Sequence, residues 1–170
     1  MAELTKVMDQ AVKASAQKEG KYLTFTLAGE EYGISILKVK EIIGMMPITS
    51  VPRTPDFVKG VINLRGKVIP VVDLRLKFGM EKMDYTDRTC IIVVEIQSQT
   101  GTVMIGIVVD AVSEVLNIKE ELIEETPTFG ARMDTDYILG MAKMEGGVKI
   151  LLNIDHVLRK EEVSFLEKVG

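Results

Sequence analysis

The sequence predicts an all-β protein built as two similar small β-barrels, and three observations carry this prediction. Short apolar runs with a two-residue period, typical of strands, recur along the 170 residues. Segments with helical periodicity are short and connect the strands or lie at the ends, which argues against a βαβ sheet. The two halves of the chain also resemble each other, which indicates two copies of one β unit.

The chain begins with a polar stretch and then changes to a strand pattern. Residues 1–20 are expected to be a polar tail, and apolar residues at helical spacing leave a short docked helix as an alternative. From residue 21 the apolar residues Leu23, Phe25 and Leu27 alternate with threonines. This alternation predicts a half-buried strand, followed by a turn at 28–31 and a second strand.

A hairpin and three short helices are predicted next. Arg65 and Gly66 separate two apolar runs, which is typical of a two-residue hairpin turn. Thr54 before a proline predicts a single helical turn, because threonine caps helices and proline suits their first position. Asp73 is predicted to cap a short helix after the hairpin, and Asp155 a final helix near the C-terminus.

The second half contains further strand patterns. The run at 89–96 is apolar throughout, which predicts a strand covered on both faces. Alternation at 102–109 and at 148–154 predicts two more strands. The last segment, 159–170, is expected to be a helical tail.

An internal repeat relates the two halves. Residues 33–43 resemble residues 106–116 at an offset of 73, and residues 57–74 resemble residues 137–154 at an offset of 80. One insertion of seven residues explains the change of offset. Strands rich in valine and isoleucine can align by chance, but glycines and a glutamate that match in order favour a duplication.

Two glycines of the repeat make a specific prediction. Gly60 and Gly140 occupy equivalent positions, so we expect the same turn with a positive φ angle at both. Each half alone is small for an independent domain, so the two barrels are expected to pack on a shared apolar face.

The composition excludes several classes of protein. Lys plus Arg number 21 against 25 Asp plus Glu, and aromatics make up 5%, so the chain lacks the basic and aromatic surface of a non-specific nucleic-acid binder. Cys90 is the only cysteine, which excludes an internal disulfide or a thiolate zinc site. The longest apolar run has five residues, far short of a membrane span, so a soluble cytoplasmic protein without membrane insertion is expected.

The sequence shows no catalytic constellation and no cofactor motif. Phosphate-binding and nucleophile-elbow patterns are missing. His156, the only histidine, is expected to be solvated at the start of a helix. Glu124, Glu125, Asp134 and Asp136 lack the spacing and the central glycine of a calcium loop, so a solvated acidic loop is expected there. We therefore expect a protein that is not an enzyme, binds no metal and is monomeric alone.

A long stretch resembles the CheW family, the adaptor proteins of bacterial chemotaxis. It reads VPRTPDFVKGVINLRG at 51–66 and continues as KVIPVVDLR at 67–75. The segments ILKVKEII at 36–43 and GIVVDAVSEVL at 106–116 are also similar to the family. The resemblance runs from about residue 21 to residue 158, which defines one CheW-like domain between the two tails.

This resemblance implies both a fold and a function. The family has two intertwined five-stranded SH3-like barrels. Its members are not enzymes: they bind the regulatory domain of the histidine kinase CheA and the cytoplasmic tip of chemoreceptors. Receptor occupancy then controls the kinase within arrays at the membrane.

Individual site residues follow from the same resemblance. The receptor-facing positions of the family correspond to Val39, Glu41, Arg65, Cys90 and Val115. The kinase-facing positions correspond to Lys59, Val68 and Phe129, the last on the second barrel, where adaptor and kinase domains close into rings. Without the family, Val39 and Val68 are equally compatible with core positions, and Phe129 with a side chain tucked inward.

Two other classes compete with the adaptor interpretation. One is a small β-barrel that binds nucleic acid, and the other is a small barrel enzyme with a bound cofactor. Within the adaptor class, a chemosensory kinase pathway that does not control flagella is an alternative to swimming chemotaxis.

Overall fold

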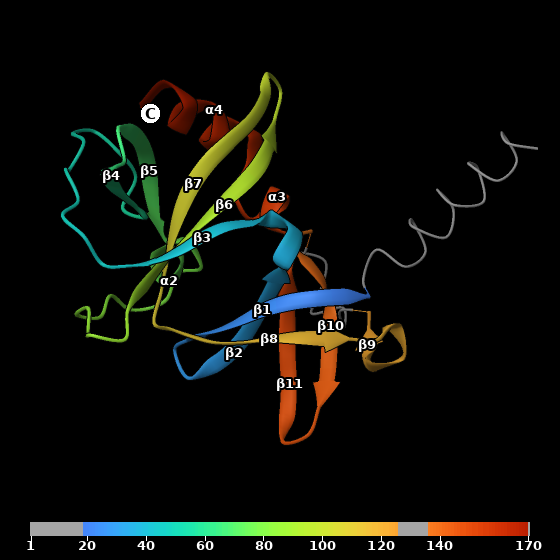
Figure 1. Ribbon diagram of the computed structural model, residues 1–170. Helices are drawn as coiled ribbons and strands as arrows, with labels where there is room; N and C mark the ends of the chain where they lie inside the picture. The colour runs from blue at the N-terminus through green and yellow to red at the C-terminus, as the bar shows by residue number, and fades with distance from the viewer. Residues whose placement is uncertain (1–18, 126–135, 170) are drawn as a thin grey trace, which may run out of the picture.

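The computed structural model describes residues 19–125 and 136–169, which form two β-sheets and a few short helices (Figure 1). The six-stranded sheet has the order β8 (Ala111–Ile118), β1 (Gly20–Leu27), β2 (Glu30–Ser35), β11 (Gly147–Leu152), β10 (Ile138–Met144) and β9 (Ile123–Glu124). The five-stranded sheet has the order β3 (Val39–Gly44), β6 (Cys90–Ser98), β7 (Gly101–Val109), β5 (Lys67–Asp73) and β4 (Val58–Leu64). The helices are η1 (Ile36–Lys38), α2 (Leu74–Lys77), η2 (Glu120–Leu122), α3 (Ile154–Val157) and α4 (Lys160–Val169). The prediction of a mostly β protein with short helices is confirmed.

The two halves of the chain exchange strands. β3 leaves the first half and pairs with β6 of the second, and β8 returns to pair with β1. Each sheet therefore combines a hairpin from one half with strands from the other. This exchange couples the halves, because neither sheet can form without both.

The strand pairing repeats with the offsets seen in the sequence. Gly33 of β2 pairs in parallel with Leu151 of β11, and the equivalent Gly106 of β7 pairs in parallel with Val71 of β5. Both pairings join one half to the other. The predicted repeat therefore corresponds to a repeated unit of the structure.

Gly60 and Gly140 lie inside strands, so the prediction of a turn at these positions is wrong. Each occupies a register shift, in β4 and β10 respectively. Gly60 has a φ of 140°, whereas Gly140 has no positive φ. What they share is a close backbone approach: a β-carbon at Gly60 would lie 2.0 Å from the Thr49 oxygen, and one at Gly140 would lie 2.8 Å from the Glu124 oxygen.

Those close approaches occur where an edge strand receives a further partner. Thr49 and Val61 of β4 exchange two backbone hydrogen bonds of 2.9 Å. At the equivalent place β9 pairs with β10 through Glu124 and Met141. The short strand β9 thus corresponds to the single bridge between Thr49 and Val61 in the other sheet. This difference explains why one sheet has six strands rather than the predicted five.

Helix capping follows the sequence in part. Asp73 caps α2 as predicted and accepts hydrogen bonds from the N–H groups of Arg75 and Leu76. Thr54 begins no helix; its hydroxyl donates to the Val51 carbonyl within a turn. Asn153, and not Asp155, caps α3.

Asp155 has a different role from the predicted cap. Its carboxylate accepts a hydrogen bond of 2.9 Å from the Gln97 N–H and pairs at 2.8 Å with the Lys38 ammonium. It therefore ties α3 to β6 and to η1.

The apolar interior consists of one large cluster and two smaller ones. The large cluster takes side chains from both sheets and from α3 and α4, including Phe25, Ile92 and Leu166. Each sheet has a smaller cluster of its own, around Ile91 and Val93 in the five-stranded sheet and around Tyr22 and Leu151 in the six-stranded sheet. The large cluster is the expected shared apolar face.

Two partly buried ion pairs connect the helices and the sheets. The Lys77 ammonium on α2 lies 2.7 and 2.9 Å from the two carboxylate oxygens of Glu162 on α4. Arg75 on α2 binds both oxygens of Asp110, at 2.7 and 2.6 Å, between β7 and β8. Asp110 also accepts the Ala28 N–H at the turn between β1 and β2, so it joins one sheet to the other.

Candidate functional site

The hairpin between β4 and β5 presents Arg65 at its tip. Arg65 and Gly66 have φ angles of 52° and 88°, the positive pair that a two-residue turn of this kind requires. The Asn63 side-chain oxygen accepts the Gly66 N–H at 2.9 Å and stabilises the turn. The predicted hairpin is confirmed, and the turn holds the Arg65 backbone in a fixed direction.

The Arg65 guanidinium forms a two-pronged ion pair with Glu41 on β3. Nη1 donates to Oε2 at 2.9 Å, and Nη2 donates to Oε1. The side chain of Arg65 is 71% exposed and that of Glu41 29% exposed. The hydrogen bond from Arg65 lowers the pKa of the Glu41 carboxyl and in turn raises the pKa of the guanidinium, so both stay charged at neutral pH. The structure thus brings together two of the five residues expected to face the receptor.

A β-bulge separates Val39 from Glu41. Val39 pairs with Val94, whose side chain lies in the large cluster, whereas Glu41 pairs with Val93, which lies in the smaller cluster of the same sheet. The register shift falls at Lys40, so residues two apart face opposite sides of the sheet. Val39 is partly buried against the large cluster and does not share the face of the Glu41–Arg65 pair.

The other two residues expected to face the receptor lie elsewhere. Cys90 begins β6 opposite Gly44, packs partly against the large cluster and donates its thiol to the Arg88 carbonyl. Val115 is 49% exposed on β8, in the other sheet. Val115 therefore belongs to a different sheet from the other four residues.

Exposed apolar residues near Val39 were not found from the sequence. Leu37 on η1 is 87% exposed and Ile42 on β3 is 43% exposed. By the register of β3, Ile42 faces the same side as Val39. Leucine in a short apolar run reads as core, so only the structure distinguishes it as a surface residue.

Replacing Arg65 by lysine tests whether binding requires the planar guanidinium or only a positive charge. The planar guanidinium holds two hydrogen bonds at once, whereas an ammonium cannot reproduce that fork. We expect Arg65→Lys to weaken binding to a receptor-tip fragment about threefold to tenfold. The melting temperature should shift by no more than about two degrees, because exposed ion pairs contribute little to stability. Titration calorimetry together with thermal melts measures both quantities, and full binding by the lysine variant would show that charge alone is recognised.

Lys59 lies near the base of the β4–β5 hairpin, away from its tip. Its ammonium is 5.9 Å from the ring centroid of Tyr85. The Tyr85 hydroxyl donates to the buried carboxylate of Asp73 at 3.0 Å. Lys59 is thus held on the surface of the five-stranded sheet.

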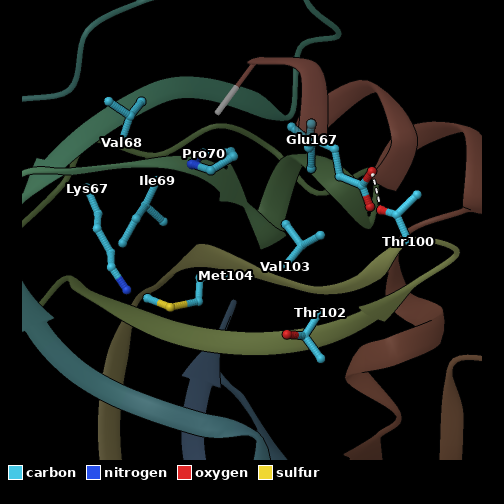
Figure 2. A pocket seen from close by; sticks show the side chains of 10 residues that line it. Lys67, Val68, Ile69, Pro70, Thr100, Thr102, Val103, Met104 and Glu167 are labelled. Carbon is cyan, nitrogen blue, oxygen red and sulfur yellow. Dashed lines mark hydrogen bonds between the residues drawn. The ribbon is translucent and has the colours of Figure 1, made fainter.

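Val68 borders an open groove beside the hairpin. The groove has a volume of about 480 Å³ and lies between β5, β7 and α4 (Figure 2). Pro70 and Val103 line it from the two strands, and Glu167 on α4 borders it, with its carboxylate accepting a hydrogen bond of 3.1 Å from Thr100. Val68 is 51% exposed at the margin. Val68 is therefore a surface residue, and the alternative of a core position is wrong.

Phe129, the third residue expected to face the kinase, lies outside the described residues. The position equivalent to Val68 in the second half is Val148 on β11, which is 50% exposed. Both hairpins therefore present a half-exposed valine.

The described residues contain neither a metal-binding cluster nor a membrane-spanning helix. In residues 19–125 and 136–169, no three His, Cys, Asp or Glu side chains converge as metal ligands would. In that same part of the chain, no helix has the length and apolarity to cross a bilayer. The residues that the structure brings together are ion pairs and apolar surfaces, which suit binding to other proteins.

Comparison with known proteins identifies the family. The sequence-family model of the CheW-like domain matches residues 21–162 of the chain. The chain belongs to the CheW family. The chemotaxis protein CheW of Klebsiella aerogenes is 40% identical over 170 residues, which cover 100% of this chain and 98% of that protein. The chemotaxis protein CheW of Bacillus subtilis is 35% identical over 142 residues, which cover 83% of this chain and 88% of that protein.

A solved structure supports the same assignment. The scaffolding protein TtCheW of Thermoanaerobacter tengcongensis is 38% identical, with a TM-score of 0.74 over 85% of this chain and 97% of that one. The protein is therefore a chemotaxis scaffolding protein of the CheW family. This membership confirms the prediction of a non-enzymatic adaptor, and it decides against the nucleic-acid module and the barrel enzyme.

Proposed function

We propose that this protein couples chemoreceptors to the histidine kinase CheA, binding the receptor tip and the regulatory domain of the kinase at two different surfaces. Glu41 and Arg65 belong to the receptor surface, together with Val39, Cys90 and Val115. Lys59, Val68 and Phe129 belong to the kinase surface. The observation that carries this proposal is the Glu41–Arg65 pair, fixed at a hairpin tip in a member of the CheW family.

The different places of Arg65 and Val68 on the β4–β5 hairpin support two separate surfaces. Arg65 occupies the tip of the β4–β5 hairpin, whereas Val68 borders the groove that faces α4. An adaptor that holds two partners at once needs surfaces that do not coincide. Arginine is enriched at interface hot spots, and a half-exposed valine beside a groove offers apolar surface that a partner can cover.

We further propose that each sheet is an SH3-like barrel of five strands. Each sheet has an apolar cluster of its own. In the five-stranded sheet, Thr49 in the segment after β3 pairs with the edge strand β4. In the six-stranded sheet, β9 in the segment after β8 pairs with β10. In this arrangement β8 and β9 are two parts of one bent strand. The domain spans 21–158, with a polar tail at 1–20 and a helical tail at 159–170.

The setting follows from the partners. We propose a cytoplasmic monomer that joins membrane-attached receptor arrays through receptor and kinase, without nucleic acid, metal or cofactor. Swimming chemotaxis is the proposed output, and a non-flagellar chemosensory pathway remains the alternative.

Separate mutations should distinguish the two surfaces. Arg65→Ala is expected to weaken binding to a receptor-tip fragment about tenfold or more and to change kinase binding much less. Val68→Asp should do the reverse, because a charge placed in an apolar contact loses its solvation. Both variants are titrated against a receptor-tip fragment and a CheA regulatory domain.

Val148→Asp is the matched control, since it introduces the same charge at the equivalent half-exposed position of the second hairpin. It should leave both pairwise affinities close to wild type. Circular dichroism confirms folding of each variant. Parallel loss of both partners in the folded Arg65→Ala and Val68→Asp proteins would contradict the two-surface proposal.

A further inference from the structure

A chain of contacts fixes the side chain of Tyr85 in the segment between α2 and β6. The Tyr85 hydroxyl donates to Oδ2 of Asp73 at 3.0 Å, while Oδ1 of the same carboxylate accepts the Arg75 N–H at 2.9 Å as the cap of α2. Asp73 is only 4% exposed, so its carboxylate cannot follow a moving tyrosine. Thr86 and Thr89 close the segment with a hydrogen bond of 2.8 Å. The ring of Tyr85 is therefore held in a fixed place.

The fixed ring lies beneath a cation. The Lys59 ammonium is 5.9 Å from the ring centroid, within the range in which the negative face of an aromatic ring attracts a cation. Lys59 forms no ion pair or hydrogen bond with a carboxylate in the part of the chain that the structure describes. Its charge is thus oriented without being neutralised.

Three other cations on or next to this sheet, Arg65, Arg75 and Lys77, differ in that respect. Lys77 and Arg75 form partly buried ion pairs with Glu162 and Asp110, and Arg65 is bound to Glu41. Lys59 and Tyr85 lie at the surface instead, with Tyr85 40% exposed. A partner can therefore reach both groups at once.

We propose that Tyr85 is a positioning residue for Lys59, and that it orders the ammonium for a carboxylate of the CheA regulatory domain. This inference rests on the proposed function, because it takes Lys59 to face the kinase. A free lysine side chain loses much of its rotamer freedom when it is immobilised at an interface. The ring restricts that freedom before binding, so less is lost when the kinase docks.

Ring and hydroxyl can be separated by mutation. Tyr85→Phe removes the hydrogen bond to Asp73 but keeps the aromatic ring, in a segment that Thr86 and Thr89 still close. It should lower the melting temperature and weaken kinase binding by no more than about twofold. Tyr85→Leu removes the ring and should weaken kinase binding about threefold to fivefold, and Tyr85→Met provides a second ring-free side chain. Receptor-tip binding should not change in any of the three.

The effect must pass through Lys59. In a Lys59→Gln background, Tyr85→Leu should weaken kinase binding by less than about 1.5-fold, because the ring no longer has a cation to orient. Affinity of the wild type should also fall with added salt more steeply than that of Lys59→Gln, as expected for a lysine that meets a carboxylate. Affinities are measured by titration calorimetry with a purified CheA regulatory domain.

Three outcomes would overturn the inference. The first is a kinase affinity that is unchanged in Tyr85→Leu and Tyr85→Met. The second is a loss of kinase affinity in Tyr85→Phe as large as that in Tyr85→Leu. The third is a loss on Tyr85→Leu in the Lys59→Gln background as large as in the wild type. Val68→Asp serves as the reference for the proposed function itself. If Val68→Asp weakens kinase binding and the Tyr85 variants do not, only the positioning role fails; if Val68→Asp also has no effect, the kinase surface is elsewhere.

Discussion

Replacing Gly60 by valine is expected to lower the free energy of unfolding by about 4 kcal/mol or more. A β-carbon at this position would lie 2.0 Å from the Thr49 oxygen and 2.7 Å from its carbonyl carbon, distances that no packed structure allows. The atoms in the way are backbone atoms, held by the two hydrogen bonds between Thr49 and Val61. The φ of 140° adds strain for any residue with a side chain. Chemical denaturation measures the loss.

Two further glycines separate the effect of space from that of backbone conformation. Gly140 lacks the positive φ, but its β-carbon would lie 2.8 Å from the Glu124 oxygen. Gly66 has a φ of 88° with nothing within 4 Å of an added β-carbon. Alanine at the three positions should destabilise in the order Gly60, Gly140, Gly66, with Gly66→Ala costing about 1 kcal/mol. Equal losses at Gly60 and Gly66 would show that conformation rather than the close approach requires the glycine.

The repeat shows what the sequence could and could not predict about the fold. The positions of Gly60 and Gly140 were found from the sequence, because glycines stand out in runs of valine and isoleucine. Their role was not, since a glycine needed for a turn and one needed for close approach look the same in a sequence. The pattern of residues also could not predict the exchange of strands between the halves. The repeat has the same sequence offsets whether each strand pairs within its own half or with a strand of the other half.

Local features were predictable where one residue decides the geometry. Arg65 and Gly66 define their turn, and Asp73 caps its helix, because both depend on neighbours within a few residues. The local sequence does not determine whether Asn153 or Asp155 caps α3. Either side chain can cap, and Asp155 is engaged by Lys38 and Gln97, which are distant in sequence.

The candidate site came from the family resemblance rather than from residue patterns. Glu41 and Arg65 are 24 residues apart, and nothing in the alternation of β3 indicates that they meet. The bulge at Lys40 is also hidden, since a plain strand would place Val39 and Glu41 on the same face. Tyr85 lies in a polar stretch that reads as a loop, so its anchoring role depends on the buried Asp73 carboxylate, which only the structure reveals.

Replacing Asp110 by asparagine is expected to destabilise the protein by about 2 to 3 kcal/mol at pH 7. Asparagine keeps the size of the side chain but removes the charge, which leaves the Arg75 guanidinium, 10% exposed, without its counter-ion. The loss is smaller than for a fully buried pair because the Asp110 side chain is 30% exposed. Glu124→Gln is the control: its pair with Lys143 has a similar 2.7 Å contact but is more than half exposed, and should contribute less than about 1 kcal/mol.

The same carboxylate makes the stability of the protein depend on pH. Burial raises the pKa of Asp110, but the hydrogen bonds from Arg75 and from the Ala28 N–H outweigh it, and the pKa lies below the ordinary value of 3.8. A carboxyl whose pKa is lowered in the folded state stabilises fully above its unfolded pKa, and that contribution is lost as the pH falls through the folded value. The difference between wild type and Asp110→Asn should therefore be constant from about pH 7 to pH 5 and shrink below about pH 4. Urea denaturation of both proteins across this range measures it, and a difference that stays constant down to pH 3 would mean that Asp110 acts through its shape and not through its charge.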